Sequence, residues 1–269
     1  MKLRSLVLDQ KELGLCKKTI ERKIKDSVVG CGSTGAIVGL SGGIDSSLVF
    51  CLAVNSGIRV HAMIMPEESV SAKQDVVDAV KLAEDANVAY SLIKINAAVN
   101  AFDSSFPWEE FDSSKRRVAL GNAKARVRMV YDYLAANSSG MLVLGTGNRT
   151  EILLGYATKY GDGGVDIQPI GALYKSQVRQ LASYVGIPQK IIDKVPTAGL
   201  WKGQTDEGEL GASYSDMDRI LYALVEEGKS VEEAAELVCG NVGLVRKLEE
   251  RMERNEHKRC LPPVVGLFD

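Results

Sequence analysis

The sequence contains no apolar run of the roughly 18 residues that a membrane-spanning helix requires. Its first residues, MKLRSLVLDQKELG, also lack the long apolar core of a secretory signal peptide. These two absences argue against a membrane protein and against an exported one. We therefore expect a cytoplasmic protein.

Cysteine and excess charge are scarce as well. The five cysteines are scattered, odd in number and without Cys-x-x-Cys spacing. This pattern argues against a zinc site and favours a reducing compartment. The net charge of −2 over 269 residues argues against a general nucleic-acid-binding protein, because a basic domain is expected there.

A lysine-bearing phosphate loop, G-x-x-x-x-G-K-[ST], is missing, but a different glycine turn is present. Residues 39–47 read GLSGGIDSS and follow the apolar run 36–38. Successive N–H groups in such a turn bind anions, and the following helix adds its dipole. Asp45 would repel a phosphate directly, so we expect it to hold Mg²⁺, which takes oxygen ligands. The alternative is an ordinary turn in which Asp45 and Ser46 cap the helix.

Short apolar segments alternate with amphipathic ones, which predicts an α/β fold with a parallel sheet covered by helices. The expected strands cover residues 36–40, 59–65, 89–95 and 141–144. The expected helices cover roughly 46–55, 71–86, 116–136 and 213–256, and a helix broken near Gly14 comes first. Residues 155–212 are expected to be mostly irregular. Ligands bind at the carboxyl ends of parallel strands, so segments 41–43 and 145–147 should share one crevice.

Three more glycine-bearing segments carry functional side chains. LGTGNRTE (144–151) lacks the third glycine of a dinucleotide fingerprint, and its Glu151 is either a second metal carboxylate or a solvated helix residue. TKYGDGGVDIQPIGALYKSQVR (158–179) presents two acids and two lysines, or else forms a polar turn before a helix near residue 174. VPTAGLWKGQTDEGELG (195–211) joins Thr197 and Trp201 to an acidic patch.

Together these segments resemble the ammonia-dependent NAD synthetase family. GLSGGIDSS resembles the PP-loop of the ATP pyrophosphatase superfamily, whereas GDGGVD and QTDEGELG are specific to the family. GNAKARVRM (121–129) and NEHKR (255–259) also match, and the resemblance spans roughly residues 30–260. We expect one synthetase domain over residues 1–269, with a PP-loop core over roughly 30–200 and C-terminal helices over 213–256. The chain is too short to carry the amidase domain of the glutamine-dependent relatives.

The resemblance implies a Rossmann-like fold and a ligase that forms a C–N bond. ATP, the co-substrate, adenylates the nicotinate carboxylate of deamido-NAD, and ammonia then attacks to give NAD, AMP and pyrophosphate. The family is homodimeric. The implied Mg²⁺ ligands are Asp45 and Glu151. The implied ATP contacts are Gly39, Leu40, Ser41, Gly42, Gly43, Ile44, Asp45, Ser46, Thr146, Lys175 and Thr197. The implied contacts to deamido-NAD are Arg126, Lys159, Asp166, His257 and Lys258.

Two residues are expected to act in catalysis. Lys175 would stabilise the charge that gathers at the α-phosphate. Asp162 would serve the ammonia step, because most ammonia is ammonium at neutral pH and must lose a proton before it attacks. The flanking glycines let the Asp162 loop approach the reacting carbonyl. In the alternatives, Asp162 only shapes a turn, or Asp166 takes its role.

Some of these residues say little by themselves. Arg126 belongs to a basic helical run that is more often a solvated face, and His257 and Lys258 lie in a basic tail. Two other functions also stay open. One is another PP-loop enzyme, acting on tRNA or GMP, although no cysteine for thiolation lies beside the loops. The other is a nucleotide-binding module without catalysis, which would not require a metal pair.

Overall fold

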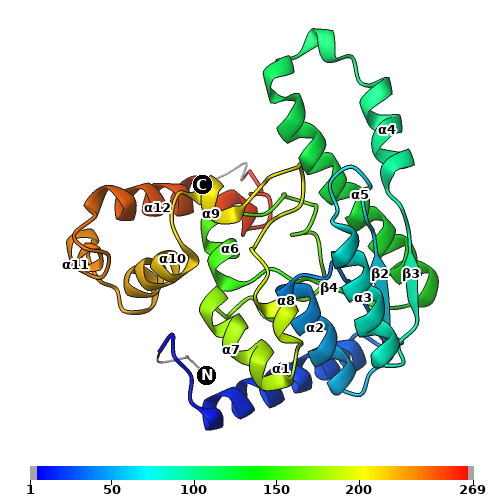
Figure 1. Ribbon diagram of the computed structural model, residues 1–269, viewed down its shortest axis with the longest axis horizontal. Helices are drawn as coiled ribbons and strands as arrows, with labels where there is room; N and C mark the ends of the chain where they lie inside the picture. Colours follow the sequence, from blue (N-terminus) through cyan, green and yellow to red (C-terminus); the bar gives the residue numbers. More distant parts are fainter. Residues whose placement is uncertain (1–4, 266–269) are drawn as a thin grey trace.

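The structure is a computed structural model that describes residues 5–265 (Figure 1). Its four strands are β1 (Ala36–Gly39), β2 (Val60–Ile64), β3 (Tyr90–Leu92) and β4 (Leu142–Leu144). All neighbouring strands are parallel, and their order in the sheet is β3-β2-β1-β4. Helices cover the sheet, so the predicted α/β fold class is confirmed.

The helices are α1 (Gln10–Gly30), α2 (Ile44–Asn55), α3 (Lys73–Asp85), α4 (Asn96–Ser105), α5 (Arg116–Ser139), α6 (Arg149–Leu154), α7 (Lys175–Val185), α8 (Gln189–Ile192), α9 (Asp206–Leu210), α10 (Tyr214–Leu221), α11 (Val231–Glu236) and α12 (Val242–Arg254). Short 3₁₀ turns lie at Trp108–Glu110, Ser113–Lys115 and Glu256–Lys258, and a π-helical turn lies at Tyr222–Glu226. Within residues 5–265, no helix has the length and apolar character needed to cross a membrane.

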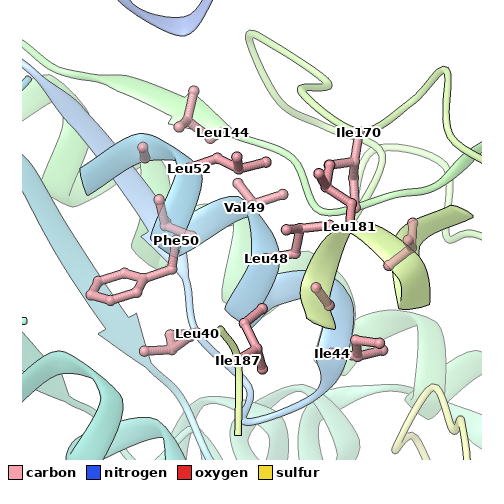
Figure 2. Packing of buried hydrophobic residues seen from close by; sticks show 14 of the residues in the cluster. Leu40, Ile44, Leu48, Val49, Phe50, Leu52, Leu144, Ile170, Leu181 and Ile187 are labelled. Carbon is pink, nitrogen blue, oxygen red and sulfur yellow. The ribbon is translucent and has the colours of Figure 1, made fainter. Parts of the chain in front are cut away.

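The alternation of side chains along the strands divides the core into two layers. Val38 and Ala62 pack with residues of α1, α2 and α7, whereas Ile37 and Met63 pack with residues of α4 and α5. Figure 2 shows the first layer, in which side chains of α2 gather with Leu181 of α7. Because α2 is enclosed by the sheet, α1 and α7, it is apolar almost all round.

The C-terminal helices share a third core with the rest of the chain. Leu153 and Leu154 of α6 and Tyr174 pack with buried residues of α10, α11 and α12. In Figure 1 these helices lie on the opposite side of the molecule from β3. The return to helices after residue 213 is therefore confirmed, and α6 connects this part to the site.

Several boundaries differ from the expectation. Helix α1 runs through Gly14 without a break, so that prediction is wrong; a Cβ at Gly14 would lie 3.0 Å from the Tyr184 hydroxyl, and glycine permits this close approach. Strand β3 is only three residues long, and α4 follows it unpredicted. The stretch 155–212 is also less irregular than expected, because it contains α7, α8 and α9.

The strand order determines where a ligand can bind. The chain moves from β1 to β2 and β3 on one side, and β4 then pairs with the other side of β1. The loops that leave β1 and β4 therefore separate at the carboxyl edge of the sheet and leave a crevice between them. Ile167 forms an isolated parallel bridge with Leu144, so it extends the sheet beside β4.

Candidate active site

A cleft of about 700 Å³ opens at the carboxyl ends of β1, β2 and β4. Residues from the segments 39–46, 143–146, 155–165 and 194–206 line it, together with side chains of α5. The prediction that segments 41–43 and 145–147 share one crevice is thus confirmed. The tertiary fold also brings the two later glycine-bearing segments to the same place.

The PP-loop, residues 39–46, is held in shape by its own side chains. The Ser46 hydroxyl donates to the Gly43 carbonyl at 3.1 Å and accepts from the Ser41 N–H at 3.2 Å. Gly43 is the N-cap of α2, so Asp45 and Ser46 lie inside the helix and do not cap it. Gly42 has φ of 81°, and a Cβ there would lie 2.2 Å from the Asp75 carbonyl oxygen. Only glycine fits that position.

Two carboxylates and one ammonium meet beside this loop. Lys175 Nζ lies 2.5 Å from Asp45 Oδ2 and 3.6 Å from Glu151 Oε1. Asn148 fixes both acids: its side-chain amide donates to Asp45 Oδ1 at 3.0 Å, and it forms the capping box of α6 with Glu151. Of the two readings of Glu151, the structure supports the one in which its carboxylate faces Asp45.

The charges in this group depend on one another. Burial raises the pKa of Glu151, and the negative charge of Asp45 raises it further. Burial alone would lower the pKa of Lys175, but the two carboxylates outweigh burial and raise it. Two acids therefore compete for one cation. Their oxygen atoms are also the ligands that a divalent cation such as Mg²⁺ prefers.

Two further residues extend this group and were not predicted as site residues. The Tyr214 hydroxyl donates to Asp206 Oδ2 at 2.9 Å and lies 3.4 Å from Glu151 Oε1. Burial raises the pKa of Asp206, while Tyr214 and Lys175 favour its ionised form. Asp206 lies in the acidic QTDEGELG segment, which was the available signal. Nothing in the sequence around Tyr214 indicated its position.

A second pair of charged residues, Arg128 and Asp132 of α5, also lines the cleft. Arg128 Nε donates to the Met65 carbonyl at 3.0 Å. Asp132 Oδ1 is buried and has no hydrogen-bond partner among the described residues. Burial raises the pKa of Asp132 to about 7, although Arg128 opposes the shift. Arg128 was recognised only as part of a basic run, and Asp132 was not recognised at all.

The remaining predicted ATP contacts, Thr146 and Thr197, line the cleft, as does Asp162. Asp162 Oδ1 accepts the Thr158 N–H at 2.7 Å, so this side chain does shape its turn. Asp162 is exposed and lines the cleft, and desolvation by the surrounding protein raises the pKa of its carboxyl group. Lys258 also lines the cleft, and its Nζ donates to the carbonyls of Gly155 and Ala157.

The other residues expected at deamido-NAD do not line the cleft. Arg126, Lys159 and His257 form an outer cluster next to it: Arg126 Nε donates to the Lys159 carbonyl at 3.3 Å, and Lys159 Nζ lies 3.3 Å from His257 Nδ1. The Asp166 carboxylate already accepts two hydrogen bonds within the protein, from the Tyr133 hydroxyl at 3.0 Å and from the Val143 N–H at 2.7 Å.

Comparison with known proteins connects this site to one family. The profile of the NAD synthase family matches residues 16–262. The chain is similar to the NH(3)-dependent NAD(+) synthetase of Archaeoglobus fulgidus, with 45% identity over 258 residues that cover 94% of this chain and 98% of the relative.

Two solved structures share the fold. The first is the NMN synthetase from Francisella tularensis, with a TM-score of 0.82 and 36% identity, covering 95% of this chain and 99% of the other. The second is the NH3-dependent NAD synthetase from Campylobacter jejuni, with a TM-score of 0.79 and 31% identity, covering 97% of this chain and all of the other, 100%.

The raised pKa of Asp132 predicts a pH-dependent stability. The carboxyl group binds its proton with a pKa of about 7 in the folded state, against an ordinary value of 3.8. Below pH 3.8 this carboxyl group is protonated in both the folded and the unfolded protein, and its ionisation does not lower the free energy of unfolding. Above pH 3.8 the unfolded protein releases the proton first, so the free energy of unfolding falls until the pH has passed about 7. Asp132→Asn cannot ionise, so its free energy of unfolding should rise relative to the parent between pH 4 and 7, by a few kcal/mol at about 1.4 kcal/mol for each pH unit.

Urea unfolding of both proteins across this pH range measures the effect. Asp26→Asn, which changes an exposed carboxylate of α1, is the matched control and should follow the parent curve. Parallel stability curves for the parent and Asp132→Asn would show that Asp132 keeps an ordinary pKa.

Proposed function

The chain belongs to the NAD synthase family, and we infer that its cleft makes NAD from deamido-NAD, ATP and ammonia. The nicotinate carboxylate is first adenylated, with release of pyrophosphate, and ammonia then displaces AMP to form the amide. A free carboxylate is a poor acyl donor because oxide would have to leave, whereas AMP leaves readily. The observation that supports this function best is the group of Asp45, Glu151 and Lys175 beside a PP-loop.

We propose that Asp45 and Glu151 hold Mg²⁺. Both carboxylates lie within 3.6 Å of one ammonium. Burial and then the negative charge of Asp45 raise the pKa of Glu151, and a divalent cation would offset both. In phosphate sites Mg²⁺ is commonly held by one or two carboxylates together with the phosphates of the substrate. The ion would supply neutralisation of the phosphate charge.

Lys175 is placed to act on the phosphates of ATP. Its side chain is 3% exposed, so its charge interacts with a bound phosphate in a poorly solvated environment. If Asp45 and Glu151 held a divalent cation, that ion would supply positive charge for Asp45, and Lys175 Nζ would be available to donate to the α-phosphate. The N–H groups of the PP-loop add further donors along the same side.

We propose that Asp162 accepts the proton of ammonium. Its desolvation raises its pKa, which makes the carboxylate a better base than an ordinary aspartate. One carboxylate oxygen is occupied by the Thr158 N–H, and the residue reaches the cleft. The turn-shaping role and the catalytic role are therefore compatible, because each uses a different oxygen atom.

Ammonia, not glutamine, is the expected nitrogen donor. Curated relatives named NH(3)-dependent synthetases match this chain over 88% to 98% of their own length. All five cysteines are free, and none of them lines the cleft. Burial raises the pKa of the Cys51 thiol to about 11, so this residue is unsuited to act as a nucleophile. Five unpaired cysteines also agree with the cytoplasmic location that we propose.

Deamido-NAD would extend from the cleft over the outer cluster of Arg126, Lys159 and His257. Arg126 shares one face of α5 with Val130 and Leu134, which are four and eight residues further on. These two side chains are 50% and 60% exposed. We propose that a second copy of the chain covers this face and the exposed Phe102 of α4, so that the dimer encloses the dinucleotide site.

Nicotinate mononucleotide is the second candidate substrate. It carries the same carboxylate as deamido-NAD, and a protein named NMN synthetase shares this fold with 36% identity. Adenylation in the cleft would activate the carboxylate of either molecule in the same way. The choice between them would depend on contacts to the second nucleotide of deamido-NAD, for which the outer cluster of Arg126, Lys159 and His257 is the proposed site.

The reaction products test the proposed function. With Mg²⁺, ATP, deamido-NAD and ammonium, the purified chain should form NAD, AMP and pyrophosphate in equal amounts. Glutamine freed of ammonia should not replace ammonium. Parallel assays with nicotinate mononucleotide measure the preference as a ratio of kcat/KM. Formation of ADP and phosphate in step with the amide would refute the mechanism.

Removing either proposed metal carboxylate should impair adenylation. Asp45→Asn and Glu151→Gln keep the shape of the side chain but remove its charge, and each should lower the rate of pyrophosphate release about 100-fold or more at limiting Mg²⁺. Glu250→Gln, on the exposed side of α12, is the control. Near-normal turnover in either variant would remove that residue from the metal site.

Asp162→Asn should separate the two half-reactions. Adenylate should form at nearly the parent rate and accumulate, while amide formation should slow about 100-fold and require more ammonium. Rapid quenching followed by chromatography resolves the two products. A variant that fails to form adenylate, or that makes NAD at the parent rate, would contradict the assignment.

The dimer face can be tested by charge insertion. The chain should sediment at twice its monomer mass, and Leu134→Glu should shift it towards the monomer because the new charge would be buried at the interface. Val77→Glu places the same charge on an exposed valine of α3 and should leave the dimer intact. A parent chain that sediments as a monomer would disprove the dimer.

A further inference from the structure

Lys194 joins the glycine turn of the PP-loop to helix α3. Its Nζ donates to the Gly42 carbonyl at 2.9 Å and to Asp75 Oδ1 at 2.6 Å, and it forms an ion pair with Asp78 Oδ2 at 2.8 Å. Gly42 belongs to the proposed phosphate site, and Asp75 and Asp78 lie in the first two turns of α3. Three segments far apart in the sequence thus meet at one ammonium.

Asp78 holds this ammonium in place. It is 2% exposed, and it also accepts from Lys190 Nζ at 2.5 Å and from Gln74 Nε2 at 2.9 Å. Burial alone would raise the pKa of Asp78, but Lys190, Lys194 and Gln74 outweigh it and lower the pKa. Asp78 therefore stays ionised at neutral pH and keeps Lys194 directed at the PP-loop.

The bonding capacity of Lys194 is mostly used within the protein. Its ammonium group donates to the Gly42 carbonyl and to Asp75, and it also forms an ion pair with Asp78. Two carboxylates therefore neutralise its positive charge. The contact through which Lys194 acts most directly on the PP-loop is the one with the Gly42 carbonyl.

The contact with Gly42 determines the direction of one peptide group. The peptide between Gly42 and Gly43 is trans, so its N–H points away from the carbonyl that Lys194 binds. Accordingly, Gly43 N donates to Ser41 Oγ at 3.3 Å, on the opposite side of the peptide. Between two glycines this peptide could turn over with little steric cost, because glycine accepts both signs of φ. A reversed peptide would present its carbonyl oxygen to the phosphates and repel them.

We propose that Lys194 is a positioning residue for ATP, which fixes the peptide between Gly42 and Gly43 so that its carbonyl oxygen stays turned away from the phosphates. This inference rests on the proposed function, since it takes ATP as the ligand of the PP-loop. Lys194 also begins the segment that carries Thr197, and both residues line the cleft. The same contact therefore ties this segment to the PP-loop.

Lys194→Met and Lys190→Met form a matched pair for the test. Both remove an ammonium that contacts Asp78, but only Lys194 contacts Gly42. Lys194→Met should raise the KM for ATP and the dissociation constant of Mg²⁺-pyrophosphate about tenfold, the effect of one lost charge-assisted hydrogen bond. Its KM for deamido-NAD should stay within about twofold of the parent value. Lys190→Met should leave all three constants within about twofold, even if it unfolds at a lower temperature.

A second variant covers the case in which Lys194→Met does not fold. Lys194→Met combined with Asp78→Asn removes one positive and one negative charge, so Asp78 is not left as an unpaired buried ion. Asp75 and Lys190, which lose their partners, both reach solvent. The Gly42 carbonyl still lacks its donor in this variant, and the tenfold weakening of pyrophosphate binding should persist. Lys194→Arg retains a cationic donor and should recover part of the affinity.

The outcomes separate this inference from the proposed function. Equal increases of the KM for ATP in Lys194→Met and Lys190→Met, or unchanged pyrophosphate binding in the double variant, would overturn the role of Lys194 while the parent still makes NAD. A parent chain that binds neither ATP nor pyrophosphate in calorimetry would overturn the proposed function, and this inference with it.

Discussion

The buried ammonium of Lys175 is the interaction on which the site depends. It lies at the first turn of α7 and reaches Asp45 at the start of α2 and Glu151 in α6, so that three helix N-terminal regions converge on it. Without a cation, two carboxylates so close together would not both stay ionised. Lys175 therefore allows the folded chain to hold an acidic pair ready for a metal ion and a phosphate.

Close approach between backbones explains why the loops around this ammonium are rich in glycine. Gly42 presses against the backbone of Asp75, and a Cβ at Gly145 would lie 2.5 Å from the Gln168 side chain. These contacts let the loops after β1 and β4 pack against later segments of the chain. The walls of the cleft are thus supported by α3 and by the 165–168 segment, and the cleft is a property of the whole fold.

The parts of the site that sequence reasoning found are those with a strong local signature. Glycine pairs after an apolar run indicated the PP-loop, and Glu151 follows the glycine-bearing segment 145–147 closely. Asp132, Tyr214 and Lys194 have no such signature. Each acts through a partner at least 60 residues away or through burial, as with Lys194 and Gly42, whose separation is 152 residues. Helix α4 was missed because its short apolar pattern runs on directly from β3.

The amino-acid sequence by itself indicated the fold class through its apolar periodicity. It indicated the family and the reaction through the resemblance of its glycine-rich motifs to NAD synthetases, because such motifs are local properties of the chain. It also identified Asp45, Glu151 and Lys175 through the motifs that contain them. Only the tertiary structure decided that Lys175 bridges the two acids, that Asp166 is engaged by Tyr133 and Val143, and that Arg126 lies outside the cleft. These facts depend on distances between helices and strands, which are set by packing and which no local pattern encodes.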